Sequence, residues 1–375
     1  MQLLSRLRVV AGLAAVAVVL SGGAPAPAQG KKGGNTKNVT FRSFDGVELS
    51  GTLYPNPGGK RDATVLLLHN FDLKKGGSSQ QEGWTRLATA LQAEGYVVLA
   101  FDFRGFGDSK AVESTFWNQK HNQFVKRRGV KPPANIDHKD FLPNYLPYLV
   151  NDIAAAKAYL DKLNDNSGCN TSSLFVIGAG DGATLGAMWM ANETRRRRDK
   201  NQNPLLAVGA PDLGDPESND LAAGVWLSIS PSLGTRTAPL SRWVVEAGKG
   251  RKVPMAFIYG KGDAKGDNTA TNLLKSIKPT GGKSKDFPNT GTKAIADTKL
   301  TGEKLLDSDL ETQKWVINYL NGVMDTRGAK IRTDRQVDRH AYWYADPKTG
   351  RALKPNKKVG EDVPSVDVTQ LLSSF

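Results

Sequence analysis

Short apolar runs that lack polar alternation recur along the chain, and segments with apolar residues at helical spacing separate them. Residues 64–69 form such a run, which is typical of a strand buried on both faces of a sheet. Trp84, Leu87 and Leu91 repeat at the spacing of one helix face, and Gly95 follows as a C-cap. The pattern predicts strands at residues 39–44, 47–54, 64–69, 96–101, 174–177, 224–229, 253–259 and 293–300. It predicts helices at residues 84–94, 145–163, 183–192, 268–277 and 309–324.

This alternation predicts an α/β fold with a doubly wound, mostly parallel sheet of about eight strands. The first two strands are joined by Asp45-Gly46, a strong hairpin signal, so the sheet begins with antiparallel strands at one edge. Two insertions interrupt the pattern, at residues 112–143 and 195–218. We predict a signal peptide, a flexible leader, one domain and a basic C-terminal tail, at residues 1–28, 29–38, 39–324 and 325–375.

The N-terminal segment has the pattern of an export signal. Arg6 and Arg8 precede a short apolar run at residues 9–20, and Ala26-Pro27-Ala28 supplies small residues for cleavage. We therefore expect cleavage near Ala28 and a periplasmic or extracellular protein with no transmembrane span in the mature chain. An uncleaved membrane anchor is the alternative, although the run is short for a bilayer.

The formal net charge of +14 suits association with acidic polymers or anionic membrane surfaces. No motif for specific nucleic-acid recognition accompanies it. Arg195–Arg198 and the tail could bind a polyanion, or the arginine run could simply be the solvated end of a helix. The tail carries Tyr342-Trp343-Tyr344, which we interpret as docking it on the domain.

Cysteine and histidine are scarce. The single cysteine, Cys169, cannot form an internal disulfide, and no histidine accompanies it in the sequence to make it a nucleophile. One cysteine and four histidines are too few for a zinc cluster, so the sequence predicts no metal site and no cofactor.

Four motifs follow one another in an order that identifies a family. They are Leu66–Phe71, which ends in His69-Asn70-Phe71, the loop Phe101–Ser109 (FDFRGFGDS), the strand–turn–helix segment Ser173–Ala183 (SLFVIGAGDGA), and Ile258–Asp263 (IYGKGD). Together they resemble the α/β-hydrolase superfamily, in its lysophospholipase-like and serine-aminopeptidase-like branch. The resemblance covers residues 39–324 and implies the α/β-hydrolase fold.

The resemblance also implies where catalytic residues would stand. The elbow G-x-S-x-G keeps its outer glycines, Gly178 and Gly182, but Gly180 replaces the serine at its apex. Asp263 occupies the position of the triad acid, and Glu303 or Lys304 falls near the place where the family has its histidine. Glycine cannot attack a carbonyl, so two triad roles are vacant and at most a small part of the family's catalytic power would remain.

The surroundings of the elbow supply the remaining candidates. Asn70, Phe71 and Asp181 stand at positions that resemble those of the oxyanion hole, with Asn70 in place of the usual glycine. A carboxylate at Asp181 would lie in the first turn of a helix and would oppose oxyanion stabilisation.

Three further residues belong to the predicted binding site. We interpret His69 as ordering its loop through hydrogen bonds, with catalysis by this residue as the alternative. Asp102 and Arg104 are expected to lock their loop through charge-assisted hydrogen bonds.

Three functions therefore remain open. The leading hypothesis is an exported, catalytically inactive protein that binds a ligand or partner. An active hydrolase of esters, amides or peptides would need a non-standard set, such as Asp181 with Asp263 and His340 or His121 as base. A scaffold attached to acidic envelope polymers would use Arg195–Arg198 and the tail.

Overall fold

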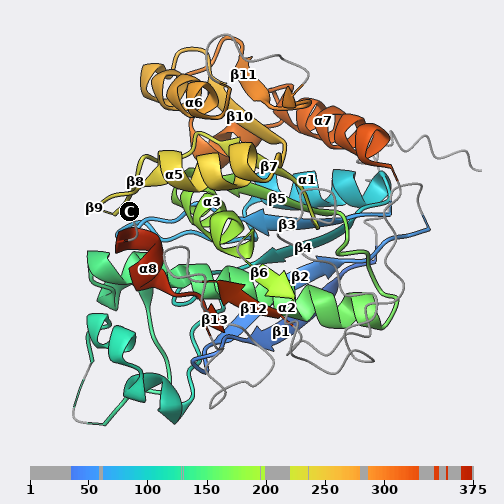
Figure 1. The fold of residues 1–375 in the computed structure, drawn as a ribbon. Helices are drawn as coiled ribbons and strands as arrows, with labels where there is room; N and C mark the ends of the chain where they lie inside the picture. The colour runs from blue at the N-terminus through green and yellow to red at the C-terminus, as the bar shows by residue number, and fades with distance from the viewer. Residues whose placement is uncertain are drawn as a thin grey trace, which may run out of the picture. The chain divides into compact units, whose positions relative to one another are not determined.

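The structure, a computed structural model, describes residues 35–58, 62–127, 129, 131–194, 196–198, 220–234, 236–278, 286–328, 342–345, 352–353 and 365–373. Its centre is an eight-stranded sheet in the order β1-β2-β4-β3-β5-β7-β10-β11 (Figure 1). Strand β2 pairs antiparallel with β1 and β4, and the other neighbours are parallel. The expected α/β fold with a mostly parallel sheet is confirmed. The strands are β1 (Lys37–Arg42), β2 (Glu48–Tyr54), β3 (Thr64–Leu68), β4 (Val97–Phe101), β5 (Leu174–Ala179), β7 (Leu221–Leu227), β10 (Met255–Gly260) and β11 (Gly291–Ile295).

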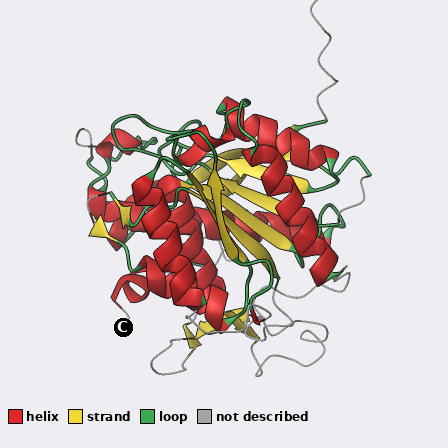
Figure 2. Ribbon diagram, turned by 90° about the horizontal axis from the view of Figure 1, so that it is seen from above, coloured by secondary structure: helices red, strands yellow, loops and turns green. Residues whose placement is uncertain are grey.

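Helices cover both faces of this sheet (Figure 2). Helices α1 (Glu82–Ala93) and α7 (Thr312–Arg327) pack on one face, and the other face carries α2 (Val150–Asp165), α3 (Gly180–Glu193), α5 (Leu240–Val244) and α6 (Ala264–Ile277). The sequence of strand β3 lacks polar alternation because both of its faces are buried. Val65 and Leu67 pack toward α1 and α7, whereas Leu66 and Leu68 pack toward α2 and α3.

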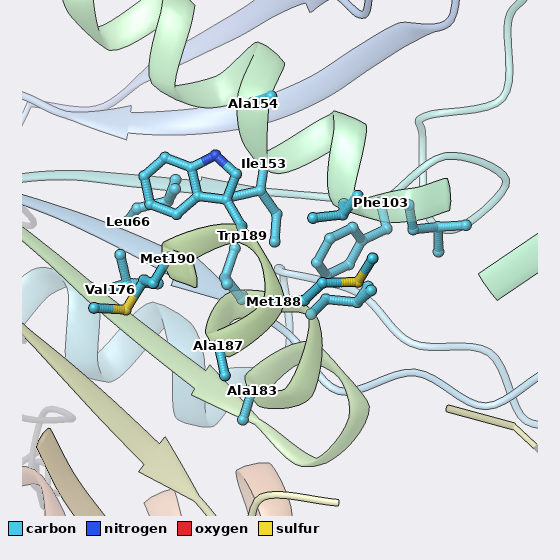
Figure 3. Packing of buried hydrophobic residues seen from close by; sticks show 14 of the residues in the cluster. Leu66, Phe103, Ile153, Ala154, Val176, Ala183, Ala187, Met188, Trp189 and Met190 are labelled. Atoms are coloured by element: carbon cyan, nitrogen blue, oxygen red, sulfur yellow. The ribbon is translucent and has the colours of Figure 1, made fainter. Parts of the chain in front are cut away.

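Helix α3 is buried along almost its whole length, which fixes the turn at its start. Met188, Trp189 and Met190 pack with Leu66 of β3 and with the α2 residues in the core (Figure 3). A helix that is apolar all round belongs inside a layered domain. The packing therefore holds the N-terminus of α3 at the carboxyl end of β5.

The predicted hairpin turn is confirmed, because Gly46 has φ +84° and donates its N–H to the carbonyl oxygen of Ser43 at 3.1 Å. Three other expectations need correction. The helix expected from residue 145 begins as a 3-10 helix, Pro143–Leu149, with Pro147 inside it, and becomes α-helical only at Val150. The last strand ends at Ile295, since Asp297 turns the chain with φ +52°.

The third correction concerns the arginine run. Arg196–Arg198 form a short strand, β6, instead of the end of a helix. Strand β6 pairs antiparallel with β12 (Tyr342–Ala345), which pairs in turn with β13 (Ala352–Leu353). The backbone of the tail's aromatic cluster thus lies along the arginine run, in agreement with a tail that packs on the domain.

The last described part of the tail packs on helices α2 and α5. The N–H of Val366 donates to Asn151 Oδ1 at 2.8 Å, and Trp243 Nε1 donates to the carbonyl oxygen of Leu371 at 3.1 Å. Helix α8 (Val368–Ser373) buries Val368 and Leu371 there.

The first insertion folds into short 3-10 helices at Ser114–Asn118, Lys120–Phe124 and His138–Asp140. Residues 1–34, with the predicted signal peptide and most of the leader, lie outside the described residues, as do Arg195, most of the second insertion and His340. Among the helices that the structure describes, none has the length and hydropathy to cross a membrane.

Candidate functional site

The elbow between β5 and α3 keeps its backbone geometry. Gly180 stands at the apex with φ +52°, a conformation that non-glycine residues rarely adopt. A Cβ on Gly178 would lie 2.7 Å from Ala183 Cα, and one on Gly182 would lie 2.2 Å from the carbonyl oxygen of His69. The outer glycines are therefore needed because β3, β5 and α3 approach one another closely.

The side chain of Asn70 fills the apex of the elbow. A Cβ on Gly180 would lie 2.2 Å from Asn70 Oδ1 and 2.6 Å from its Cγ. The same Oδ1 accepts a hydrogen bond from the backbone N–H of Asp181 at 3.1 Å. In the α/β-hydrolase elbow, the N–H after the nucleophile binds the substrate's oxyanion. In this chain the carboxamide oxygen of Asn70 lies in the space of the nucleophile. It also accepts the N–H that would be a donor of the oxyanion hole.

Glu303 lies on the opposite side of the Asn70 amide, in the 3-10 turn Gly302–Leu306 between β11 and α7. A Cβ on Gly302 would lie 3.7 Å from Asn70 Nδ2. Burial raises the pKa of Glu303, and interactions with its own N–H and with the Asn70 amide lower it less strongly. Its Oε2 is buried and has no hydrogen-bond partner among the described residues. Asn70 thus bridges the elbow and the loop where the family carries its base.

Asp263 acts as a helix cap in this structure. Its Oδ1 accepts a hydrogen bond from the N–H of Gly266 at 3.0 Å, at the start of α6. A carboxylate at this position stabilises the helix by accepting a first-turn N–H and by facing the positive end of the helix dipole. The position of the triad acid is therefore filled by a residue that contacts its own helix.

Asp181 stands in the first turn of α3, as expected, and is partly buried. Burial raises its pKa, while the Ser230 hydroxyl and the N–H of Gly234 lower it less strongly and the charge of Asp72 raises it further. The carboxyl group is thus associated with the segment after β7.

His69 and Phe71 are structural residues of the loop after β3. His69 Nε2 accepts the N–H of Phe103 at 3.1 Å, so Nδ1 carries the proton and donates to the carbonyl oxygen of Asn70 at 2.8 Å. Burial lowers the pKa of His69, and nearby Asp102 opposes this less strongly. Phe71 is buried against Phe103. These contacts leave no ring nitrogen of His69 available to a ligand.

Arg104 is fully buried and, like Asp102, makes charge-assisted hydrogen bonds, but the two residues do not pair with each other. Its guanidinium binds Asp45 at 2.6 Å, Asp152 at 2.7 Å and the Tyr145 hydroxyl at 3.0 Å. The partners lie far away in the sequence, which is why local reasoning missed them. The guanidinium joins the first hairpin to α2 and is not a ligand-binding group.

Asp102 is also satisfied within its own loops. Its Oδ1 accepts the N–H of Ser79 at 2.6 Å, and its Oδ2 accepts the N–H of Asp108 at 3.1 Å. A Cβ on Gly107 would lie 1.9 Å from Oδ2, so the glycine there is required by the close approach of this carboxylate. The Asp102 carboxylate therefore holds the loops that carry Ser79 and Asp108 and is not available to a ligand.

The described histidines do not supply a base at the elbow. His121 Nε2 lies 3.0 Å from Asp45 Oδ2, within the network of Arg104. The other base considered, His340, lies outside the described residues. His138 was given no role by the sequence, yet its ring stacks on Phe106 at 4.7 Å and its Nε2 is buried without a partner among the described residues. No pattern in the sequence indicates a role for His138, because its contact with Phe106 depends on how the insertion folds.

Within the described part of the chain, no group of histidine, cysteine, aspartate and glutamate side chains could hold a metal ion. Burial raises the pKa of Cys169 to about 12, and its thiol donates to the carbonyl oxygen of Leu160. This thiol is therefore a structural group.

An open groove of about 540 Å³ lies between α1 and α7, lined by Arg86, Glu94, Ser308, Leu310, Gln313, Lys314, Ile317 and Asn318.

No protein-family pattern and no curated protein matches the chain. Solved structures with similar folds are found at low sequence identity. An esterase of Pyrococcus furiosus is 18% identical, with 77% of this chain and 91% of that chain covered at a TM-score of 0.46. A dienelactone hydrolase of Anabaena variabilis is 14% identical, with 78% and 98% covered at a TM-score of 0.46. A thermostable carboxylesterase from a metagenomic library is 12% identical, with 79% and 90% covered at a TM-score of 0.45.

Proposed function

We propose that this protein, whose sheet order and elbow are those of the α/β-hydrolase superfamily, is catalytically inactive and binds a ligand or partner. One observation carries the proposal. The space of the nucleophile's Cβ at residue 180 is filled by the carboxamide of Asn70. A nucleophile and a substrate carbonyl cannot share that space with it.

The other catalytic positions support the same conclusion. Glu303 replaces the base, and Asp263 binds the N-terminus of α6. Acyl transfer needs a nucleophile and a base within hydrogen-bond reach of each other. Since neither role has a suitable side chain among the described residues, the residual rate would come only from positioning, which is a small fraction of triad catalysis.

The strongest competing function uses Asp181 as a carboxylate nucleophile. Asp181 is close to the elbow, but its carboxyl group is associated with the Ser230 hydroxyl and the N–H of Gly234. Such chemistry requires a carboxylate that is free and aimed at the apex. The geometry therefore favours binding over catalysis.

An assay of p-nitrophenyl acetate and butyrate hydrolysis by the purified protein distinguishes the two functions. We expect wild type, Asp181→Ala and the exposed control Asp307→Ala to release p-nitrophenol at the same rate as buffer. A wild-type rate well above buffer that is lost in Asp181→Ala and kept in Asp307→Ala would refute inactivity and establish the non-standard hydrolase.

Export is the second part of the proposal. It is supported by the basic start, the apolar run at residues 9–20 and the small residues before Gln29. Expression with the whole N-terminus should yield a mature protein whose first residue is Gln29, as read by intact-mass spectrometry. A product retaining Met1 in the membrane fraction would favour the anchor instead.

A scaffold role is favoured by one observation. Strand β6 (Arg196–Arg198) pairs with β12 of the basic tail, so the two basic segments meet in one sheet. With a net charge of +14, the chain would bind acidic envelope polymers through these two segments. Retention on heparin at low salt should fall when residues 196–198 are changed to glutamine and the tail is deleted. Unchanged retention in that variant would refute this role.

A further inference from the structure

The first insertion carries a short antiparallel ladder. Val125 and Phe141 form its bridge, and the N–H of Leu142 donates to the carbonyl oxygen of Phe124 at 2.9 Å. The side chains of Val125 and Phe141 are buried. Because successive side chains of an extended strand point to opposite faces, Leu142 points away from this buried face. It is 37% exposed, more than any other large apolar side chain in the described part of the chain.

Leu142 does not stand alone on the outer face of the ladder. Phe124 lies across the ladder from it and is partly exposed. The Phe124 ring stacks on Tyr148, which is also partly exposed, with 6.3 Å between the ring centroids. A single exposed apolar side chain is ordinary, whereas a cluster of them marks a surface that binds something.

Positive charge accompanies these apolar side chains. Lys126 follows Val125 in the ladder and therefore shares the outer face with Leu142. The exposed cations of the insertion are Lys120, Lys126, Arg127, Lys131 and Lys139. Its carboxylates are fewer, and they are Glu113, Asp137 and Asp140. Two of them pair with cations outside the insertion, Glu113 with Arg42 and Asp137 with Lys110.

This combination matches one class of partner. At the surface of an anionic bilayer, apolar side chains enter the headgroup region, while lysine and arginine side chains extend toward the phosphates. A soluble acidic polymer would pair with the cations but would leave Leu142 exposed. A neutral apolar partner would bury Leu142 but would leave the cations without partners.

We propose that the insertion face, formed by Phe124, Leu142, Tyr148 and Lys126, binds an anionic lipid bilayer. The inference goes beyond the proposed function and does not depend on it, since it involves neither the elbow nor the arginine run of β6. Leu142 and Phe124 enter the headgroup region, and Lys126 and the neighbouring cations bind lipid phosphates.

Co-sedimentation with phospholipid vesicles tests the proposal. The protein is the mature chain from Gln29, which keeps every described residue and lacks the apolar run at residues 9–20. Wild type should bind phosphatidylglycerol vesicles and should bind phosphatidylcholine vesicles much more weakly. Leu142→Ser should lower the partition coefficient at least about fivefold, because less apolar surface is inserted. Lys126→Gln should lower it about fivefold, the usual contribution of one cation near an anionic surface.

Helix α6 supplies the matched controls, since Leu274 is partly exposed and Lys275 is exposed there. Leu274→Ser and Lys275→Gln should bind phosphatidylglycerol vesicles as wild type does. Retention on heparin distinguishes a lipid surface from a soluble polyanion, and Leu142→Ser should be retained like wild type. Should Leu142→Ser fail to fold, Leu142→Ala replaces it with the same criteria.

The proposal is overturned if wild type does not prefer the anionic vesicles, or if either insertion variant binds them as wild type does. Equal losses in the α6 controls would also overturn it, and so would a matching loss of heparin retention in Leu142→Ser. The assay measures no turnover, so its failure leaves the inactivity of the protein untouched. Ester hydrolysis by wild type would overturn the inactivity without changing vesicle binding.

Discussion

The carboxamide oxygen of Asn70 lies 2.2 Å from the position that a Cβ on Gly180 would take. The two residues are 110 positions apart in the sequence, and the fold brings them together. Glycine at the apex leaves room for Asn70, and Asn70 fills the space that a nucleophile would otherwise use. The pair therefore replaces the serine and glycine that resemblance to the α/β hydrolases would place there.

Gly180→Ala is expected to destabilise the fold by about 1–3 kcal/mol, because the new Cβ collides with Asn70 and because φ is +52°. With Asn70→Gly in the same chain, the collision is gone and only the cost of the left-handed backbone, roughly 1–2 kcal/mol, remains. Urea denaturation of the four proteins in this double-mutant cycle gives the coupling free energy.

Gly291→Ala is the matched control for this cycle, since a Cβ there meets no atom within 4 Å and its backbone is ordinary. It should change the free energy of unfolding little in either background. If Gly180→Ala costs as much in the Asn70→Gly background as in wild type, the side chains at positions 70 and 180 do not compete for space.

A second prediction concerns the pH dependence of stability. Burial raises the pKa of Glu303 in the folded protein, so ionisation at neutral pH works against folding. Glu303→Gln should therefore stabilise the protein at pH 7. This gain should shrink as the pH falls through the folded pKa toward the ordinary value of 4.5, where the wild-type carboxyl group is also neutral.

Chemical denaturation at several pH values measures this effect. Glu311→Gln is the contrasting variant, because Lys293 holds the pKa of this exposed carboxyl group below its usual value. It should give no gain at pH 7. Equal behaviour of the two variants across the pH range would contradict the assigned environment of Glu303.

The fold could be predicted from the sequence because its signals are local. The unalternating run Thr64–Leu68 and the turn Asp45-Gly46 each depend on near neighbours, and each is found as expected. Gly178 and Gly182 likewise reveal the elbow, since close packing of strand and helix restricts those positions to glycine. The ends of elements were less predictable. Pro147 and the turn at Asp297 altered them locally.

The contacts of the site could not be predicted in the same way. Arg104 had a carboxylate two residues away in Asp102, yet it pairs with Asp45 and Asp152, which the topology brings to it. Asn70 was recognised as replacing the usual glycine of the turn after β3, but the sequence does not say that its side chain reaches the N–H of Asp181. The absence of the serine at position 180 is visible in the sequence. That Asn70 fills its space is visible only in the structure.

A third prediction concerns helix α8. Leu371 is completely buried, and its carbonyl oxygen accepts the Trp243 indole N–H at 3.1 Å. Leu371→Ala should lower the free energy of unfolding by about 2–5 kcal/mol, as for other fully buried leucines. The neighbouring Leu372 is only partly buried, so Leu372→Ala should cost clearly less. Equal, small losses by thermal denaturation would mean that α8 does not pack on α5.

The last prediction tests the buried network around Arg104. Burial alone would raise the pKa of Asp45, but the charge and hydrogen bonds of Arg104 and the hydrogen bond to His121 hold it well below its ordinary value. Arg104→Met leaves Asp45 and Asp152 buried without their cation and should cost about 3–5 kcal/mol at pH 7. The exposed Arg42, which pairs with Glu48 and Glu113, is the control, and Arg42→Met should cost about 0–1 kcal/mol.

Without Arg104 the two aspartates take up protons more readily when folded, so the deficit of Arg104→Met should shrink as the pH falls from 7 toward 4. Denaturation curves at both pH values decide this. A deficit that stays constant would show that the loss comes from packing and not from the unpaired carboxylates.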